Sequence, residues 1–141
     1  MPAQAVRVPE PPSPILLREQ AGNVAVLTLN RPAARNSLSE ALIAELHGAL
    51  RQIGDDAKVR AVVIAANGSA FSAGHDMKEL TARRTDADRG RAYFAQIMNA
   101  CSAMMQAIER ARYVRPRSTQ ITARHASAAS PITPAIAVAL Y

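Results

Sequence analysis

A strand–helix–strand pattern over residues 24–66 most strongly limits the folds open to this chain. Val24–Leu29 is an apolar run rich in β-branched residues, and residues 60–66 form a second one. Between them, residues 36–53 carry an apolar stripe at helical spacing, formed by Leu38, Leu42, Ile43, Leu46, Leu50 and Ile53. Such a βαβ unit predicts a parallel strand pair with a right-handed crossover. The expected fold class is therefore α/β.

The remaining segments predict further elements around this unit. Ser37 with Glu40 three residues later has the spacing of a capping box, and Gly54 is the glycine expected at the end of the helix. Residues 15–18 are expected to begin an edge strand that ends in a turn at residues 21–23. A second long helix is predicted over residues 88–112, and the polar residues 81–86 are expected to be a mobile connection.

Residues 71–80, with the sequence FSAGHDMKEL, follow the second buried strand and are typical of a ligand-binding turn. Gly74 allows the backbone to turn sharply and approach a ligand closely. Asp76 is placed to cap a helix that runs through Lys78. The free N–H groups at such a helix start attract negative charge, and Lys78 lies within one turn of them, where a phosphate could bind.

Two motifs carry a family resemblance. FSAGHDMKEL resembles the oxyanion-hole segment of the enoyl-CoA hydratase/isomerase (crotonase) superfamily, and VAVLTLNRP with the later Asn36-Ser37-Leu38 is similar to its first strand, turn and helix start. The resemblance covers residues 15–108, the N-terminal part of that fold, and implies a partial crotonase-like ββα spiral core. It also implies acyl-CoA thioester substrates, hydratase or isomerase chemistry in fatty-acid metabolism, and trimer-like homo-oligomers among full-length relatives.

The resemblance assigns roles to individual residues. The backbone N–H of His75 corresponds to the first oxyanion donor, and its imidazole is expected to line the pocket, with a general-base role as the lesser alternative. Ala33, Ala34 and Arg35 correspond to the segment that contacts coenzyme A, where Arg35 is either a phosphate contact or a surface residue. The other expected substrate-binding residues are Ala73, Gly74, Asp76, Met77 and Lys78. Asp76 is expected to act chiefly as the helix cap, and Ala73 and Met77 to line the acyl-pantetheine channel.

The ends of the chain differ from the middle. Residues 1–14 contain five prolines and predict a flexible leader. Residues 109–141 form a divergent basic tail, expected to be poorly ordered and without regular periodicity until residues 135–140. No glycine follows Gly90 and no acidic residue follows Glu109, whereas the family places its second oxyanion donor and catalytic glutamates in this region. We therefore expect a truncated, weakly active or inactive member. A non-catalytic acyl-CoA-binding remnant and a basic interaction tail on a decayed domain are the alternatives.

Composition excludes several other classes of protein. The net charge is +6, of which residues 1–108 contribute +2 and residues 109–141 contribute +4. The basic run from Arg110 to Arg117 has no interleaved stacking aromatic beyond Tyr113, which argues against nucleic-acid binding. The single Cys101 fits a reducing, cytoplasmic location, and no apolar run reaches membrane-spanning length. The sequence shows no zinc, P-loop or Rossmann motif, so no metal or cofactor is expected beyond the coenzyme A of the substrate.

Overall fold

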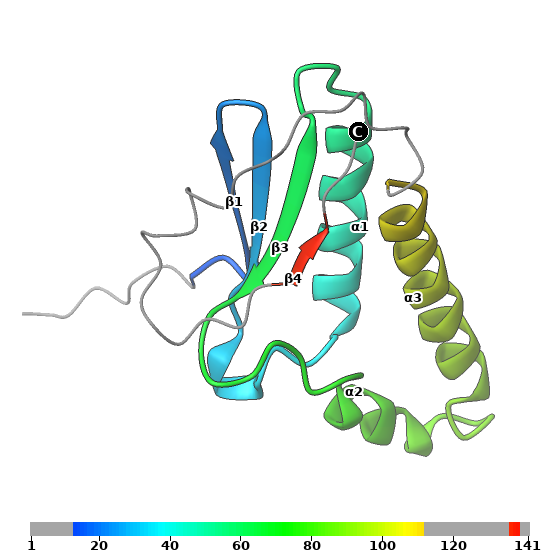
Figure 1. The fold of residues 1–141 in the computed structure, drawn as a ribbon. Helices are drawn as coiled ribbons and strands as arrows, with labels where there is room; N and C mark the ends of the chain where they lie inside the picture. Colours follow the sequence, from blue (N-terminus) through cyan, green and yellow to red (C-terminus); the bar gives the residue numbers. More distant parts are fainter. Residues whose placement is uncertain (1–12, 112–135, 139–141) are drawn as a thin grey trace, which may run out of the picture.

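The computed structural model describes residues 13–111 and 136–138. Within these residues, four strands form one sheet in the order β1-β2-β3-β4: β1 Leu16–Ala21, β2 Val24–Leu29, β3 Ala61–Ala66 and β4 Ile136–Val138 (Figure 1). The helices are α1 Glu40–Gly54, α2 Met77–Ala82 and α3 Arg91–Ala111, with short 3-10 turns η1 Pro32–Ala34 and η2 Arg83–Thr85.

The strand pairing follows the predicted βαβ unit. β2 and β3 pair in parallel, with Val24 opposite Ala61 and Leu29 opposite Ala66, and α1 makes the crossover between them. β1 pairs with β2 as an antiparallel hairpin, closed by a turn in which Gly22 has a φ of +60°. That positive φ is where glycine is favoured. The α/β fold class and the edge hairpin predicted from the sequence are therefore confirmed.

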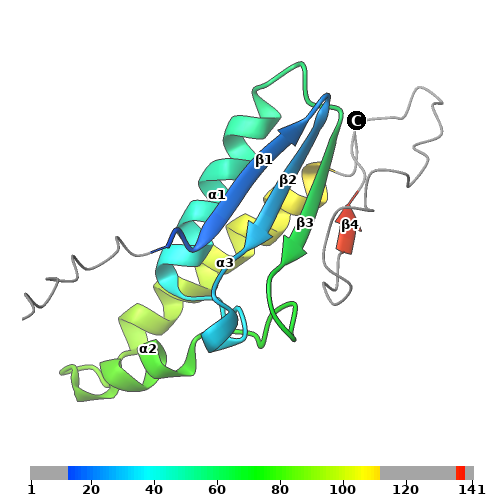
Figure 2. The ribbon, with the colours of Figure 1, turned by 90° about the vertical axis from the view of Figure 1, so that its left-hand side faces the viewer.

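Helices cover one face of the sheet in two layers. Figures 1 and 2 show α1 packed on the sheet and α3 packed on the far side of α1, with α2 below them. In β2, every second residue is buried, namely Ala25, Leu27 and Leu29, as expected for a strand with one covered face. Figure 2 shows the opposite face of β1, β2 and β3 turned toward the viewer.

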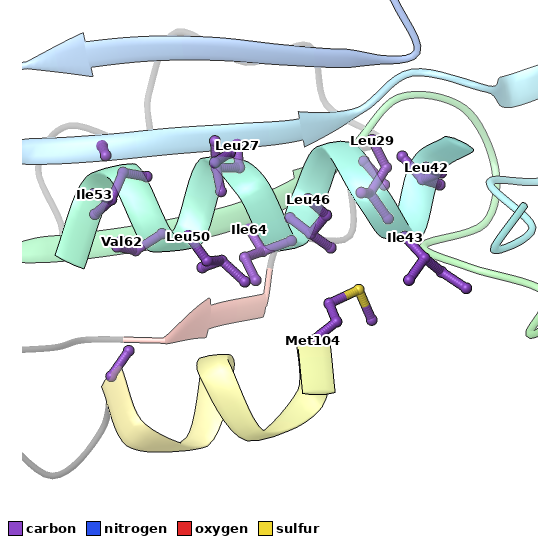
Figure 3. Packing of buried hydrophobic residues seen from close by; sticks show 14 of the residues in the cluster. Leu27, Leu29, Leu42, Ile43, Leu46, Leu50, Ile53, Val62, Ile64 and Met104 are labelled. Carbon is purple, nitrogen blue, oxygen red and sulfur yellow. The ribbon is translucent and has the colours of Figure 1, made fainter. Parts of the chain in front are cut away.

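The core lies between the sheet and the two long helices. Leu27 and Leu42 are fully buried, and Met104 reaches from α3 toward α1 at the same level as Leu46 and Ile43 (Figure 3). Fully burying one such side chain stabilises a fold by about 1.5–3 kcal/mol. This core holds the β3 end and the α1 start at fixed positions, and these two ends carry the candidate site.

The start of α1 differs from the predicted capping box. The N-cap is Ser39, whose side chain accepts a hydrogen bond from the N–H of Leu42 at 3.2 Å, so the helix begins two residues later than Ser37 would set it. Ser37 instead contacts Arg31, whose guanidinium donates to the Ser37 carbonyl at 2.6 Å. The Ser37 hydroxyl is bonded to the Asp76 carboxylate at 3.3 Å, and Ser39 supplies the cap instead.

Smaller differences occur at other helix ends. Gly54 is the last residue of α1, with Asp55 as C-cap in the right-handed region, and Gly54 has no positive φ. Residues 81–86, expected to be a connection without regular structure, instead contain the end of α2 and η2.

The long helix predicted over residues 88–112 is confirmed as α3, with bounds Arg91–Ala111. The expected leader and tail lie mostly outside the described residues. Within the predicted tail, residues 109–111 end α3 and residues 136–138 form β4, which falls in the segment where periodicity returns. No helix in residues 13–111 has the length and apolar character needed to cross a membrane.

Candidate functional site

Two loops meet at the ends of β2 and β3. One runs from Arg31 to Leu38 and the other from Asn67 to Asp76, and the side chain of Asn36 joins them. Asn36 is fully buried; its amide nitrogen donates to the carbonyls of Asn67 and Ala70, each at 2.8 Å, and its oxygen accepts from the N–H of Arg31 at 2.8 Å. The two loops are thus held together by a fully paired buried amide, the arrangement that such a polar group requires.

An ion pair makes a second connection between the loops. The Arg31 guanidinium lies 3.0 Å from the Asp76 carboxylate, and Ser37 Oγ donates to the same carboxylate oxygen at 3.3 Å. The other Asp76 oxygen accepts from the N–H of Lys78 at 3.1 Å, which makes Asp76 the N-cap of α2, as predicted. Burial favours the neutral carboxyl, but Arg31, the Lys78 N–H and Ser37 together hold the pKa of Asp76 below its ordinary value.

Leu38 and His75 form an isolated parallel bridge between the same loops. The N–H of Leu38 donates to the Gly74 carbonyl at 2.8 Å, and the Leu38 carbonyl accepts from the N–H of Asp76 at 3.0 Å. Gly74 has a φ of +89°, a backbone conformation that would be strained for a residue with a side chain. The backbone on both sides of His75 is therefore fixed by Leu38.

The N–H groups around His75 are occupied, but its own is not. Ala73 donates to the Arg35 carbonyl at 3.0 Å, and Gly74 donates to Ser72 Oγ at 3.3 Å. No described residue accepts a hydrogen bond from the N–H of His75. The imidazole Nε2 of His75 is also buried, and the described part of the chain offers it no partner. An unoccupied donor in a fixed turn is the geometry that stabilises a developing negative charge.

The structure brings together some of the residues predicted for the site and not others. Arg35 and Ala73 share a backbone hydrogen bond, and Gly74 and Asp76 both bond to Leu38. The Arg35 side chain is exposed, and its backbone has a φ of +48° at the end of η1, the turn that contains Ala33 and Ala34. Met77 and Lys78 are exposed at the start of α2. Among the described residues, no hydrogen bond joins Ala33 to the His75 turn.

The joining residues were not predicted to act in the site. Asn36, Ser37 and Leu38 were identified only as a helix start, and Arg31 only as part of a turn. The signal available in the sequence was the occurrence of both motifs in one chain, because the Asn36 amide donates to carbonyls of the other loop. Among the described residues, no group of three or more histidine, cysteine or acidic side chains is arranged to hold a metal ion.

Comparisons with known proteins give the family. The model of the enoyl-CoA hydratase/isomerase family matches residues 19–123. Enoyl-CoA hydratase domain-containing protein 3, mitochondrial, of Homo sapiens is 35% identical over 107 residues, which are 76% of this chain and 33% of that protein. A probable enoyl-CoA hydratase of Rhizobium meliloti is 46% identical over 65 residues, which are 46% of this chain and 25% of that protein.

Solved structures give the same result. The enoyl-CoA hydratase of Mycobacterium smegmatis superposes with a TM-score of 0.63 and 44% identity, over 71% of this chain and 37% of that one. Human enoyl-CoA hydratase domain-containing protein 3 superposes with a TM-score of 0.59 and 29% identity, over 70% of this chain and 36% of that one. The chain spans about a third or less of the length of the curated relatives named above. It belongs to the enoyl-CoA hydratase/isomerase family and corresponds to the N-terminal part of the crotonase fold.

Proposed function

We propose that this chain binds an acyl-CoA thioester, with the backbone N–H of His75 donating a hydrogen bond to the thioester carbonyl oxygen. The observation that carries the proposal is the contrast within one turn: the N–H groups of Ala73, Gly74 and Asp76 all have acceptors, and that of His75 has none among the described residues. Because Leu38 fixes the backbone on both sides, this donor is preorganised before any ligand arrives.

The chemistry that such a donor supports is enolate formation. When a thioester is deprotonated at Cα, or an enoyl thioester is attacked at Cβ, negative charge develops on the carbonyl oxygen. A single preorganised oxyanion donor is typically worth about 2.7–4 kcal/mol of the barrier. Enoyl-CoA hydratases are named for the second of these reactions, so hydration is the reaction class we propose for the site.

The coenzyme A moiety is proposed to follow the opposing loop. Ala33, Ala34 and Arg35 form the outer turn of that loop, and the Arg35 carbonyl is bonded directly to Ala73 in the oxyanion turn. Arg35 and Lys78 are exposed cations on the two loops, where either one could contact a phosphate.

The side chain of His75 is proposed to line the pocket without acting as a base. Its Nε2 atom is buried with no partner in the described region, so no carboxylate or hydroxyl there activates it. We also propose that hydration by this 141-residue chain alone is weak or undetectable, since no acidic residue follows Glu109 to supply the family's general acid–base pair. The cytoplasmic location and the trimer-like assembly expected from the sequence remain predictions.

Calorimetry with two substitutions at one position tests the binding proposal. Butyryl-CoA should bind more tightly than coenzyme A to the wild-type chain. His75→Pro removes the N–H and should abolish that difference, because proline has no backbone donor, whereas His75→Ala keeps the N–H and should retain most of it. Circular dichroism establishes that both variants fold. Equal losses in the two variants would assign the effect to the imidazole and refute the backbone-donor role.

Turnover is measured separately, as the loss of enoyl-thioester absorbance with crotonyl-CoA. Binding without turnover would identify this chain as a non-catalytic acyl-CoA-binding member of its family. Turnover that is abolished by His75→Pro would establish hydration, and it would show that our expectation of a weak or inactive chain is wrong.

A further inference from the structure

A pocket of about 360 Å³ lies beside the start of α2, next to the His75 turn. One wall comes from α2 and η2 and includes Met77, Leu80 and Arg84. The opposite wall comes from the start of α3 and the turn before it, and includes Arg89, Arg91 and Phe94. Three arginines and three apolar residues are therefore among the residues that line one opening.

The three arginines of this pocket have no carboxylate partner among the described residues. The ion pair formed within residues 13–111 is Arg31–Asp76, at the N-cap of α2, and it includes none of these three arginines. The carboxylate nearest in sequence, Asp88, accepts from the N–H groups of Gly90 and Ala92 at 2.9 and 2.8 Å and thereby caps α3. Arg83, which is not part of the pocket, lies over the ring of Tyr93 at 4.7 Å. Three arginines and no acidic residue line the pocket, so its lining is positively charged, with the ionised Asp88 beside it.

The turn before α3, which contains Arg89 and Gly90, is tightly packed. Arg89 and Gly90 both have positive φ, at 57° and 79°. A Cβ added at Gly90 would lie 2.9 Å from the Arg83 carbonyl oxygen, closer than real contacts allow. A non-glycine residue in the left-handed region costs free energy and is found where the surrounding structure fixes it. Arg89 is thus held in place by the packing of Gly90 against η2.

The α2 wall of the pocket begins at Met77, two residues after His75. Met77 and Leu80 lie three residues apart, which places them on one face of α2, and Arg84 follows in η2. Lys78, the residue proposed to meet a coenzyme A phosphate, is one position round the helix from Met77 and does not line the pocket. From Met77 to Ala82 the helical rise of α2 is about 7.5 Å, the scale of a six-carbon acyl chain.

We propose that this pocket binds a carboxylate, which we assign to the far end of the acyl chain of a dicarboxylic acyl-CoA. This assignment rests on the proposed function of the His75 turn. With the thioester oxygen at His75, the chain would run past Met77 and Leu80, and its terminal carboxylate would reach the arginines. Guanidinium groups match the planar geometry of a carboxylate and bind it through paired hydrogen bonds.

Calorimetry with two thioesters of equal chain length tests the proposal. Adipyl-CoA should bind at least about tenfold more tightly than hexanoyl-CoA, since a hydrogen bond to a charged group contributes about 1.5–3 kcal/mol. The triple variant R84Q/R89N/R91Q should remove that preference and leave hexanoyl-CoA binding unchanged. The control R51Q/R60Q/R110Q removes the same charge at three exposed positions outside the pocket and should keep the preference.

The other outcomes each give a decision. Equal affinities for the two thioesters in the wild-type chain would overturn the proposal while leaving the proposed function intact. Weaker binding of coenzyme A itself by the triple variant would assign the arginines to a coenzyme A phosphate and would also overturn it. If neither thioester binds, the proposed function fails. In that case, the amide chemical shifts of Thr81 and Gly90 are measured on adding free adipate, with hexanoate as the control. Larger shifts with adipate would support a carboxylate site in the pocket. Equal shifts with the two acids would refute that site.

Discussion

Leu38 and His75 lie on opposite loops and are joined as a single parallel bridge, in which Leu38 makes both hydrogen bonds and His75 makes neither. This relationship explains how a turn outside any strand keeps a fixed backbone. Leu38 holds Gly74 through its N–H and Asp76 through its carbonyl, at 2.8 and 3.0 Å. The N–H of His75 between them has no acceptor within residues 13–111.

The first prediction concerns Asn36, which should be among the most sensitive polar positions. Asn36→Ala leaves the N–H of Arg31 and the carbonyls of Asn67 and Ala70 without their partner. Each buried polar group left unpaired costs about 1–3 kcal/mol, so the free energy of unfolding should fall by at least about 2 kcal/mol in urea titrations.

Two controls separate the causes of that loss. Asn36→Gly relieves the positive φ of 51° but still lacks the amide, so it should remain nearly as destabilised. Asn99→Ala, at an exposed position of α3, should change the stability by less than about 0.5 kcal/mol. A glycine variant that is as stable as the wild-type chain would show that backbone strain, and not the buried hydrogen bonds, sets the cost.

The second prediction concerns the pH dependence of stability through Asp76. Its folded-state pKa lies below the ordinary value of 3.8, so its ionised form stabilises the fold above that value. The contribution is lost as the pH falls through the folded-state pKa. Asp76→Asn should cost about 1–2 kcal/mol at neutral pH, as for loss of a charged helix cap.

Unfolding curves recorded from neutral pH down to below 3.8 measure this contribution. The difference between the wild-type chain and Asp76→Asn should shrink in the acid range. Asp55→Asn, at an exposed position in the loop after α1, serves as the control and should run parallel to the wild-type curve. A constant difference between wild type and Asp76→Asn at all pH values would contradict the role of the charge.

The third prediction compares two neighbouring methionines of α3. Met104 is 2% exposed and faces α1, whereas Met105 is 53% exposed. Met104→Ala should reduce the free energy of unfolding by about 2–5 kcal/mol, the range for large-to-small core substitutions. Met105→Ala should change it by less than about 0.5 kcal/mol. Similar effects of the two substitutions in thermal unfolding would show that α3 does not pack on α1 through this face.

The fourth prediction concerns two glycines with opposite expected outcomes. Gly90→Ala should destabilise the chain, because of its positive φ and the close Arg83 carbonyl. Gly48 lies inside α1 with no atom near its Cβ position, so Gly48→Ala should stabilise by about 0.5–1 kcal/mol. The melting temperature should therefore fall in one variant and rise in the other. A rise in both would mean that the turn before α3 is not formed as described.

The sequence predicted those parts of the fold that depend on local patterns. The βαβ unit could be predicted because each of its elements has a recognisable local pattern. The apolar stripe that ends at Ile53 has helical spacing, and the run Val24–Leu29 is rich in β-branched residues. The N-cap could not be predicted, because Ser37 and Ser39 are both good caps and the Ser37 hydroxyl is bonded to Asp76, on the other loop. That contact depends on tertiary structure.

The candidate site was predicted in the same uneven way. The turn around Gly74 and the cap at Asp76 follow from residue type, and the structure has both. The buried amide of Asn36 was not predicted, since its partners lie more than thirty residues away. The arginines of the pocket were not predicted either, because only the packing of α3 beside η2 brings Arg84 and Arg91 together. Periodicity describes single helices and strands and gives no information about which residues of different elements lie close together.

The central claim is that the His75 N–H donates to the thioester oxygen, and the amide proton of His75 reports on it directly. Nuclear magnetic resonance on the ¹⁵N-labelled chain, titrated with butyryl-CoA, should move that proton downfield, as a new hydrogen bond to a carbonyl requires. Coenzyme A without the acyl group should not produce the shift, while the Asp76 amide, already bonded to Leu38, should move little in either titration. If butyryl-CoA binds and the His75 amide proton stays in place, the account of this site is wrong.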